Sequence, residues 1–211
     1  PVAAVILGVL LGAALGLING ALVNVTGLHS FIITLGTQAI FRGATLIVSN
    51  SSAVFGFPAS FTKSISASVL GIPVIAIVAI IVALILAFLT IKTKLGRNIY
   101  ALGGNKESAW YSGINVKLHT LIVFIISGLC AGIAGIVLLG RVGSAEPAAA
   151  TGFETYAIAA AIIGGTSFFG GKGKIHGVVV GGLIIGVINY GMNILSLSST
   201  LQQVVTVSYT H

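Results

Sequence analysis

The stretch Val69–Ile91, VLGIPVIAIVAIIVALILAFLTI, contains no charged side chain, and it decides the class of the fold. A helix needs about 20 predominantly apolar residues to cross the roughly 30 Å hydrocarbon core of a membrane. The whole chain resembles this stretch in composition, because 56% of its 211 residues are hydrophobic, 6% are charged and the mean hydropathy is +1.15. Soluble domains carry about 25% charged residues. The sequence therefore predicts an all-α protein that crosses a membrane several times.

Six segments are expected to cross the membrane. The segment 31–48 is long enough but contains Gln38 and Arg42. The segment 155–167 is short and ends in glycines, so it is predicted to be a short or broken helix. A polar loop at 92–117 is too poor in apolar residues to cross. The predicted segments are 2–19, 31–48, 69–91, 118–139, 155–167 and 175–195.

The basic residues predict which side of the membrane each loop occupies. If all six segments cross, the loops 92–117 and 168–174 share one side, and the loops 50–64 and 140–154 share the other. Cytoplasmic loops carry an excess of Lys and Arg, so the first side is expected to be cytoplasmic. The first side has Lys92, Lys94, Arg97, Lys106, Lys117, Lys172 and Lys174, and the second has Lys63 and Arg141.

Two segments share one sequence pattern. Residues 12–19 read GAALGLIN and residues 182–189 read GLIIGVIN. In the topology above the two segments run in opposite directions, and inverted repeats are typical of transporters. Glycines four residues apart let helix backbones approach closely in a membrane. The pattern therefore predicts that Gly12, Gly16, Gly182 and Gly186 pack helices together.

A small set of polar residues lies within the apolar segments. An ionised Arg42 in a membrane is costly unless it is paired or hydrated. Its candidate partners are Glu146, Glu154 and backbone carbonyls of the broken helix, and a structural role and a pathway role both remain open. The other polar residues could bind a polar uncharged solute or could form hydrogen bonds between helices. The candidate pathway residues are Asn19, Gln38, Arg42, Glu154, Thr166, Ser167 and Asn189.

The loop 92–117 is predicted to contain a short helix. Asn105 is a suitable N-cap residue for a helix over 106–111 that stops at Gly113. Trp110 and Tyr111 would be exposed on it, and aromatic residues of this kind anchor protein interfaces. Insertion of the helix into the membrane interface is the alternative.

The sequence argues against several function classes. The segment 170–177 is rich in glycine and lysine, but no Ser or Thr follows either lysine, so it is not a Walker A loop. The three acidic residues, Cys130 and the histidines form no pattern of catalytic or metal-binding residues. The net charge of +7 is spread over loops, which argues against nucleic-acid binding. A secondary transporter or channel for a small polar solute remains possible, although no acidic residue lies inside a segment to bind a coupling ion.

Three motifs resemble those of a known family, the membrane permease subunits of bacterial sugar ABC importers of the ribose, xylose, arabinose and galactoside type. The resemblance extends over nearly the whole chain. The motifs are LGRNIYALGGN at 95–105 continuing to SGINV at 112–116, then AIAA at 157–160 leading to GGTS at 164–167 and GGKG at 170–173, and TLGT at 34–37 leading to Arg42 and Gly43.

The resemblance implies a type II importer permease of ten helices with inverted internal repeats, in the bacterial inner membrane. Such a subunit forms a dimer with a second copy and receives a monosaccharide from a periplasmic sugar-binding protein. A separate cytoplasmic ATPase uses the ATP, and this chain would bind no cofactor. The resemblance also makes the polar loop the element that couples to the ATPase, through Gly103, Gly104, Asn105, Trp110, Tyr111, Ser112, Gly113 and Ile114.

By the same resemblance, residues 1–206 are expected to be an incomplete transmembrane domain that covers about helices four to nine. The final residues 207–211, VSYTH, depart from the apolar last helix of the family. They resemble the translated end of a sequencing adapter, and we expect them to be non-native.

Overall fold

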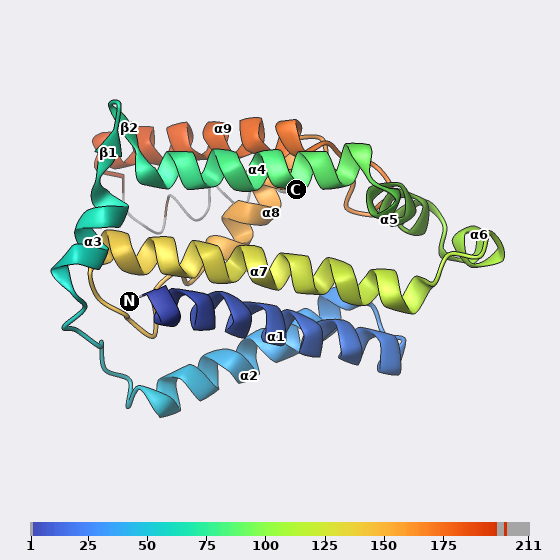
Figure 1. Cartoon of the computed structure of the whole chain (residues 1–211), viewed down its shortest axis with the longest axis horizontal. Helices are drawn as coiled ribbons and strands as arrows, with labels where there is room; N and C mark the ends of the chain where they lie inside the picture. The colour runs from blue at the N-terminus through green and yellow to red at the C-terminus, as the bar shows by residue number, and fades with distance from the viewer. Residues whose placement is uncertain (1, 198–200, 202–211) are drawn as a thin grey trace. The chain divides into compact units, whose positions relative to one another are not determined.

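The computed structural model describes residues 2–197 and residue 201, and its described part is mainly helical (Figure 1). The predicted tail 207–211 lies outside the described residues. Five of the helices are long and apolar enough to cross a membrane, namely α1, α2, α4, α7 and α9. The elements are α1 (Val2–Thr26), α2 (Ser30–Val48), α3 (Ala59–Ser66), β1 (Ser68–Val69), β2 (Ile72–Pro73), α4 (Val74–Lys92), α5 (Lys94–Gly104), α6 (Lys106–Tyr111), α7 (Val116–Val142), α8 (Phe153–Ile163) and α9 (Ile175–Ile194).

The chain folds as two compact units, and the long helix α4 contributes to both. The first unit contains α1, α2, α3, the β1–β2 hairpin, the beginning of α4, and α7 with the loop that follows it. The second unit contains the rest of α4, together with α5, α6, α8 and α9. Both units therefore combine segments that lie far apart in the sequence.

In the first unit, α1 lies along α7 with glycines at the contact (Figure 1). A Cβ atom added to Gly12 would overlap the carbonyl oxygen of Gly128, and one added to Gly16 would overlap that of Phe124. In the other direction, a Cβ atom on Gly132 would lie 3.1 Å from the Cα atom of Val9. Only residues without a side chain allow this approach, which is how helices pack closely in lipid.

In the second unit, α8 packs on α9 through Gly177 and Gly181 and not through Gly182 and Gly186. A Cβ atom on Gly181 would overlap the carbonyl oxygen of Ala160, and one on Gly177 would overlap that of Gly164. Cβ atoms on Gly182 and Gly186 would meet no atom within 4 Å among the described residues. Successive helical residues point about 100° apart, so Gly182 cannot share the packed face of Gly181. The predicted packing role of Gly182 and Gly186 is therefore not what the described structure shows.

Two segments begin or end differently from the prediction. The stretch 68–73 is a short antiparallel hairpin in which Val69 pairs with Ile72, so the helix expected from residue 69 begins at Val74. Leu70 and Gly71 turn the chain with φ angles of +53° and +82°. Pro73 has no N–H group to donate within a helix, which suits a position just before α4. In addition, α1 continues seven residues beyond the predicted end at residue 19, as far as Thr26.

The helix α8 is short, as expected of a broken segment. Its 11 residues rise only about 16 Å, about half of the hydrocarbon thickness. It ends at Ile163 with Gly164 as its C-cap, and Gly165 follows with a φ of +82°, a conformation that residues other than glycine rarely adopt. Ala159 and Ala160 on this helix form a small buried cluster with Ile185 of α9.

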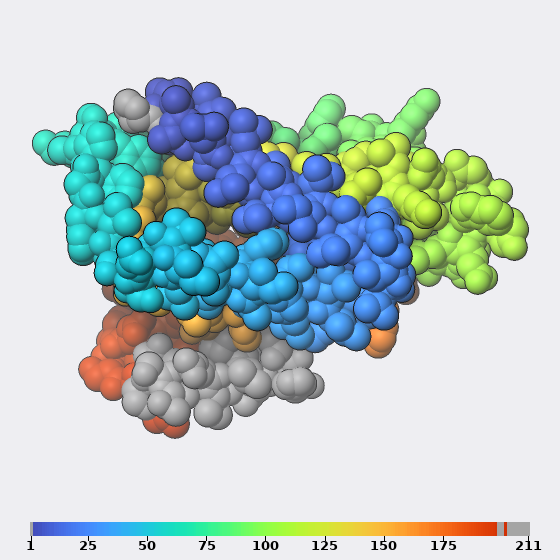
Figure 2. Space-filling model, turned by 90° about the horizontal axis from the view of Figure 1, so that it is seen from below, coloured from blue at the N-terminus to red at the C-terminus, as the bar shows by residue number. Residues whose placement is uncertain are grey.

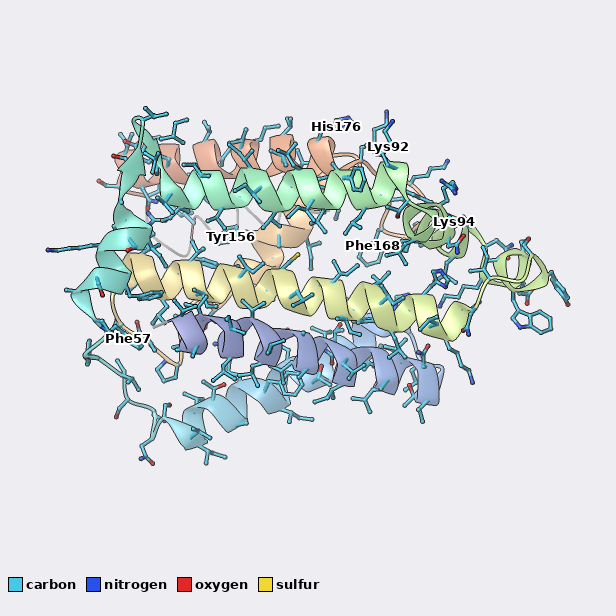
Figure 3. All side chains as sticks on the ribbon, viewed as in Figure 1. Phe57, Lys92, Lys94, Tyr156, Phe168 and His176 are labelled. Atoms are coloured by element: carbon cyan, nitrogen blue, oxygen red, sulfur yellow. The ribbon has the colours of Figure 1, made fainter. Side chains whose placement is uncertain are left out.

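Two contacts join loops that are predicted to share a side of the membrane. In the first unit, Val54 and Ala145 exchange two backbone hydrogen bonds of 2.9 Å, which joins the loops after α2 and after α7. In the second unit, Gly103 of α5 contacts Gly170 and Gly171 between α8 and α9. In the same unit, Lys92 lies at the end of α4, Lys94 at the start of α5 and His176 at the start of α9 (Figure 3).

Large apolar side chains remain exposed along the spanning helices. No residue is buried in the most apolar 18-residue window of α4 or of α7. Figure 2 shows α1 and α2 side by side on one face. Leu7 and Leu10 of α1 and Ile40 of α2 are all exposed. Exposed apolar surface of this extent is what a lipid environment requires. The all-α, multiply spanning class predicted from composition is thus confirmed.

Candidate functional site

The first unit contains a polar cavity of about 480 Å³ that opens between α1, α2 and the loop after α7. It brings together three of the predicted pathway residues, Asn19, Gln38 and Arg42. Glu146, which was considered as a partner of Arg42, lines the same cavity. The other lining residues are Thr34, Thr37, Phe41, Thr45, Pro147 and Ala149.

The helix α2 supplies most of this lining from a single face. Its cavity residues recur at intervals of three or four along the sequence, from Thr34 to Thr45, which is the spacing of one side of an α-helix. The helix begins after His29, whose side chain accepts a hydrogen bond from the Phe31 N–H. The fixed start of α2 and its regular winding therefore direct Gln38 and Arg42 to the same side as the threonines.

The threonines of α2 present acceptors to the cavity. Thr37 Oγ1 donates to the carbonyl oxygens of Ile33 and Thr34 at 3.1 Å, and Thr45 Oγ1 donates to that of Phe41 at 2.8 Å. Each hydroxyl has only one proton, so its remaining capacity is to accept. The sequence analysis missed Thr34, Thr37 and Thr45 as site residues, although their spacing with Gln38 and Arg42 was visible.

Asn19 contributes an acceptor that has no partner among the described residues. Its Oδ1 atom is buried and makes no hydrogen bond. Buried polar atoms in proteins are almost always hydrogen-bonded, and leaving one unpaired costs about 1–3 kcal/mol. The Asn19 side chain also lines the cavity, so a donor from a solute or from water would reach this atom once the side chain turns toward the cavity.

The other predicted pathway residues lie in the second unit and not in this cavity. Glu154 is exposed in the first turn of α8, and Asn189 is half-buried on α9. Thr166 and Ser167 lie in the loop after α8, where the Thr166 Oγ1 atom is buried without a hydrogen bond in the described structure. The Ser167 N–H donates to the carbonyl oxygen of Lys172 at 2.9 Å, so it stabilises the glycine loop 164–174.

The predicted coupling loop consists of two helices at a sharp turn. The expected short helix is present as α6, and Asn105 caps it by accepting from the Ser108 N–H at 2.9 Å. It ends at Tyr111, Ser112 is its C-cap, and Gly113 follows with a φ of +79°. The preceding helix α5, which was not predicted, is capped at its start by Thr93.

The predicted coupling residues divide into exposed and packed groups. Trp110 and Tyr111 are 63% and 79% exposed, and their rings form an edge-to-face pair 4.9 Å apart. Gly103, in contrast, packs against Gly171 of the glycine loop. Ile114 is half-buried, and the remaining predicted coupling residues, Gly104, Asn105, Ser112 and Gly113, are also exposed.

The glycine loop also forms a basic pocket of about 490 Å³ in the second unit, lined in part by Tyr100, Lys172, Lys174 and His176. Among the described residues, no three His, Cys, Asp or Glu side chains are grouped so that they could hold a metal ion.

Comparison with known proteins places the chain in a family. Residues 1–208 match the family described as "Branched-chain amino acid transport system / permease component". The chain is 66% identical over 203 residues to the D-allose transport system permease protein AlsC of Escherichia coli (strain K12). The aligned residues make up 96% of this chain and 62% of that protein. The ribose import permease protein RbsC of the same strain is 41% identical over 202 residues, covering 92% and 62%.

A third relative, the galactose/methyl galactoside import permease protein MglC of Salmonella typhimurium (strain LT2), is 36% identical over 213 residues, covering 97% of this chain and 63% of that protein. The chain thus spans about three fifths of the length of these relatives. No solved structure matches the chain. The resemblance to sugar ABC permeases is confirmed, and the chain belongs to this family of transport permeases, whose members named here are transport subunits and not enzymes.

Proposed function

We propose that this chain belongs to the membrane-spanning subunit of an ATP-driven bacterial importer for a monosaccharide. The observation that carries the proposal is the 66% identity to a D-allose transport permease over 96% of the chain. The relatives named for ribose and galactoside import have the same length of similarity, which favours a sugar over an amino acid as solute.

The polar cavity of the first unit supports a sugar as the solute. A sugar hydroxyl both donates and accepts, so a suitable path offers both kinds of partner. The cavity offers acceptors at Asn19, Glu146 and the threonines, and donors at Gln38 and Arg42. One arginine and one glutamate in the same cavity leave it without a strong net charge, which suits an uncharged solute.

The family also supports a set of partners. A cytoplasmic ATPase would bind the exposed aromatic pair of α6, where Trp110 and Tyr111 supply the large apolar contact area that is typical of interface anchors. A periplasmic binding protein would deliver the sugar, and a second copy of the subunit would complete the pathway in the inner membrane. ATP would be bound by the ATPase and not by this chain.

Uptake into proteoliposomes tests the function. The protein from the complete natural gene is reconstituted with the ATPase and the binding protein encoded beside it, and radiolabelled D-allose, D-ribose and D-galactose are offered in turn. We expect accumulation of one of these sugars that requires both ATP and the binding protein. Uptake by the membrane protein alone, driven by a proton or sodium gradient, would instead establish a secondary transporter. Equilibration without any energy source would establish a channel.

A further inference from the structure

We propose that Tyr100 is a positioning residue that fixes helix α5 to the glycine loop 164–174, so that the coupling segment and the α8–α9 pair move as one body. The proposal rests on the proposed function, because it assigns a path for motion within a transporter driven by a separate ATPase. Tyr100 is not one of the predicted coupling residues, which begin at Gly103.

The first observation is a hydrogen bond between distant parts of the sequence. The hydroxyl of Tyr100 on α5 donates to the carbonyl oxygen of Gly173 at 2.8 Å, across 73 positions in the sequence. Tyr100 is half-buried and its side chain also lines the basic pocket of the glycine loop. The bond therefore connects α5 directly to the residues that precede α9.

The second observation is a contact between backbones one helical turn further along α5. A Cβ atom on Gly103 would overlap the backbone nitrogen of Gly171 and lie 3.1 Å from its Cα atom. A Cβ atom on Gly170 would lie 2.9 Å from the carbonyl oxygen of Gly103. Gly170 and Gly171 also have φ angles of +90° and +72°, which glycine adopts without strain. Backbones in such close contact resist sliding, because little free volume remains between Gly103 and the Gly170–Gly171 segment to absorb a shift.

The third observation is that the glycine loop is firmly connected to α8 and α9. The Ser167 N–H donates to Lys172 across the loop at 2.9 Å. Gly164 at the start of the loop and Gly177 in the first turn of α9 pack so closely that a Cβ atom on either would overlap the carbonyl oxygen of the other. A displacement of the loop must therefore displace the adjoining ends of both helices.

The exposed end of α5 leads to the proposed ATPase contact. The Asn105 N–H donates to the carbonyl oxygen of Ala101 at 3.1 Å, and the Asn105 side chain caps α6. Leu102 and Ala109 are buried, at 8% and 3% exposure, and they anchor α5 and α6 in the second unit. A push on α6 would thus pass through α5 and Tyr100 to the α8–α9 pair.

The matched variants are Tyr100→Phe, Gly103→Ala and Gly182→Ala. Tyr100→Phe removes only the hydroxyl, and Gly103→Ala forces α5 away from Gly171. Gly182→Ala is the control, because Gly182 lies on α9 outside the predicted coupling residues and a Cβ atom there would meet no atom within 4 Å among the described residues. Each variant of the complete natural protein is reconstituted with its ATPase and binding protein, and the readout is the number of sugar molecules imported per ATP hydrolysed.

We expect Tyr100→Phe to lower this ratio by roughly two- to tenfold, the range for one lost hydrogen bond. Gly103→Ala should lower it at least as much, and Gly182→Ala should leave it unchanged. A defect in folding lowers uptake and ATP hydrolysis together and leaves the ratio unaltered, so the ratio separates positioning from stability.

An unchanged ratio in both Tyr100→Phe and Gly103→Ala would overturn the proposal, and so would an equal fall in Gly182→Ala. Failure of the proposed function gives a different result, because the unmodified protein itself would then import no sugar in response to ATP.

Discussion

Asn24 Nδ2 donates a hydrogen bond to the carbonyl oxygen of Lys117 at 2.8 Å, which ties the end of α1 to the start of α7. The two residues are 93 positions apart. The carbonyl of Lys117 lies in the first turn of α7, and the bond fixes where the two helices align. The glycine contacts between Gly12, Gly16 and α7 require this alignment, because a shift along the helix would bring side chains into the contact.

Asn24→Ala is predicted to destabilise the protein modestly. Loss of one hydrogen bond between helices costs about 0.6–1 kcal/mol. Thermal unfolding of the purified protein in detergent measures the effect as a lower Tm. Thr26→Ala is the control, because the Thr26 hydroxyl donates to the carbonyl oxygen of Leu22 and accepts from the Leu28 N–H, and neither bond reaches α7. Equal Tm values for Asn24→Ala and the unmodified protein would show that the bond contributes nothing to stability.

Gly16→Ala is predicted to destabilise the protein strongly, because the added methyl group would overlap the carbonyl oxygen of Phe124. Forcing extra atoms into a packed contact costs about 1–3 kcal/mol. Gly186→Ala occupies a helical position with open space in the described structure, so it should be neutral or slightly stabilising. Both are measured by thermal unfolding in detergent. A similar loss of stability in the two variants would contradict the assignment of the packed face.

Sequence reasoning predicted the fold class because apolar length and the scarcity of charge are sufficient to identify spanning helices. It extended the third segment across 69–73 because Val69, Leu70 and Ile72 are apolar, although Gly71 and Pro73 indicated a turn. It chose between neighbouring glycine ridges on α9 without tertiary information, and the ridge that packs contains Gly181 and not Gly182. A glycine pattern specifies the possible packing faces of a helix but not which face meets a neighbour.

The candidate site was predicted in part. Charge and polarity within an apolar segment identified Asn19, Gln38 and Arg42, and all three line one cavity. The threonines of α2 were missed because threonine is tolerated in spanning helices by bonding to its own backbone, as Thr45 does. The bond from Tyr100 to Gly173 joins residues 73 positions apart, and no local pattern indicates such a pair.

Cysteines at Ser108 and Ser112 are predicted to form crosslinks to the ATPase. Both residues are exposed, Ser108 lies on α6, and Ser112 follows directly after that helix. The background carries Cys130→Ala, which removes the native thiol. Crosslinking in membranes that contain the reconstituted complex should be strong, and it should change when nucleotide is added.

The matched control for crosslinking is Ser52→Cys, an exposed position in the loop after α2. It should form no crosslink to the ATPase, since it is predicted to face the other side of the membrane. Crosslinks from Ser52→Cys and none from Ser108→Cys would reverse the assignment of the coupling segment.

The same cysteines test the orientation in the membrane. Seven basic residues on one side against two on the other predict that Ser112 is cytoplasmic and Ser52 is periplasmic. A maleimide that cannot cross membranes should label Ser52→Cys in intact spheroplasts and Ser112→Cys only after lysis. The opposite pattern would place the exposed aromatic pair of α6 outside the cell and remove it from any ATPase contact.

Asn19→Ala is predicted to weaken sugar transport without the loss of stability expected of Asn24→Ala on the same helix. The buried Oδ1 of Asn19 has no partner among the described residues, so its removal takes away no hydrogen bond within the described protein. If a sugar hydroxyl bonds to this atom, the variant loses about 1 kcal/mol of binding free energy, which corresponds to about a fivefold rise in KM for uptake.

Uptake kinetics in proteoliposomes and Tm in detergent distinguish the two asparagines. Asn19→Ala should raise KM and leave Tm unchanged or higher, because an unpaired buried acceptor is itself destabilising. Asn24→Ala should lower Tm and leave KM unchanged, because its side chain bonds to Lys117 and lies outside the residues that line the cavity. A lower Tm with unaltered KM for Asn19→Ala would instead assign Asn19 to helix packing and remove it from the solute path.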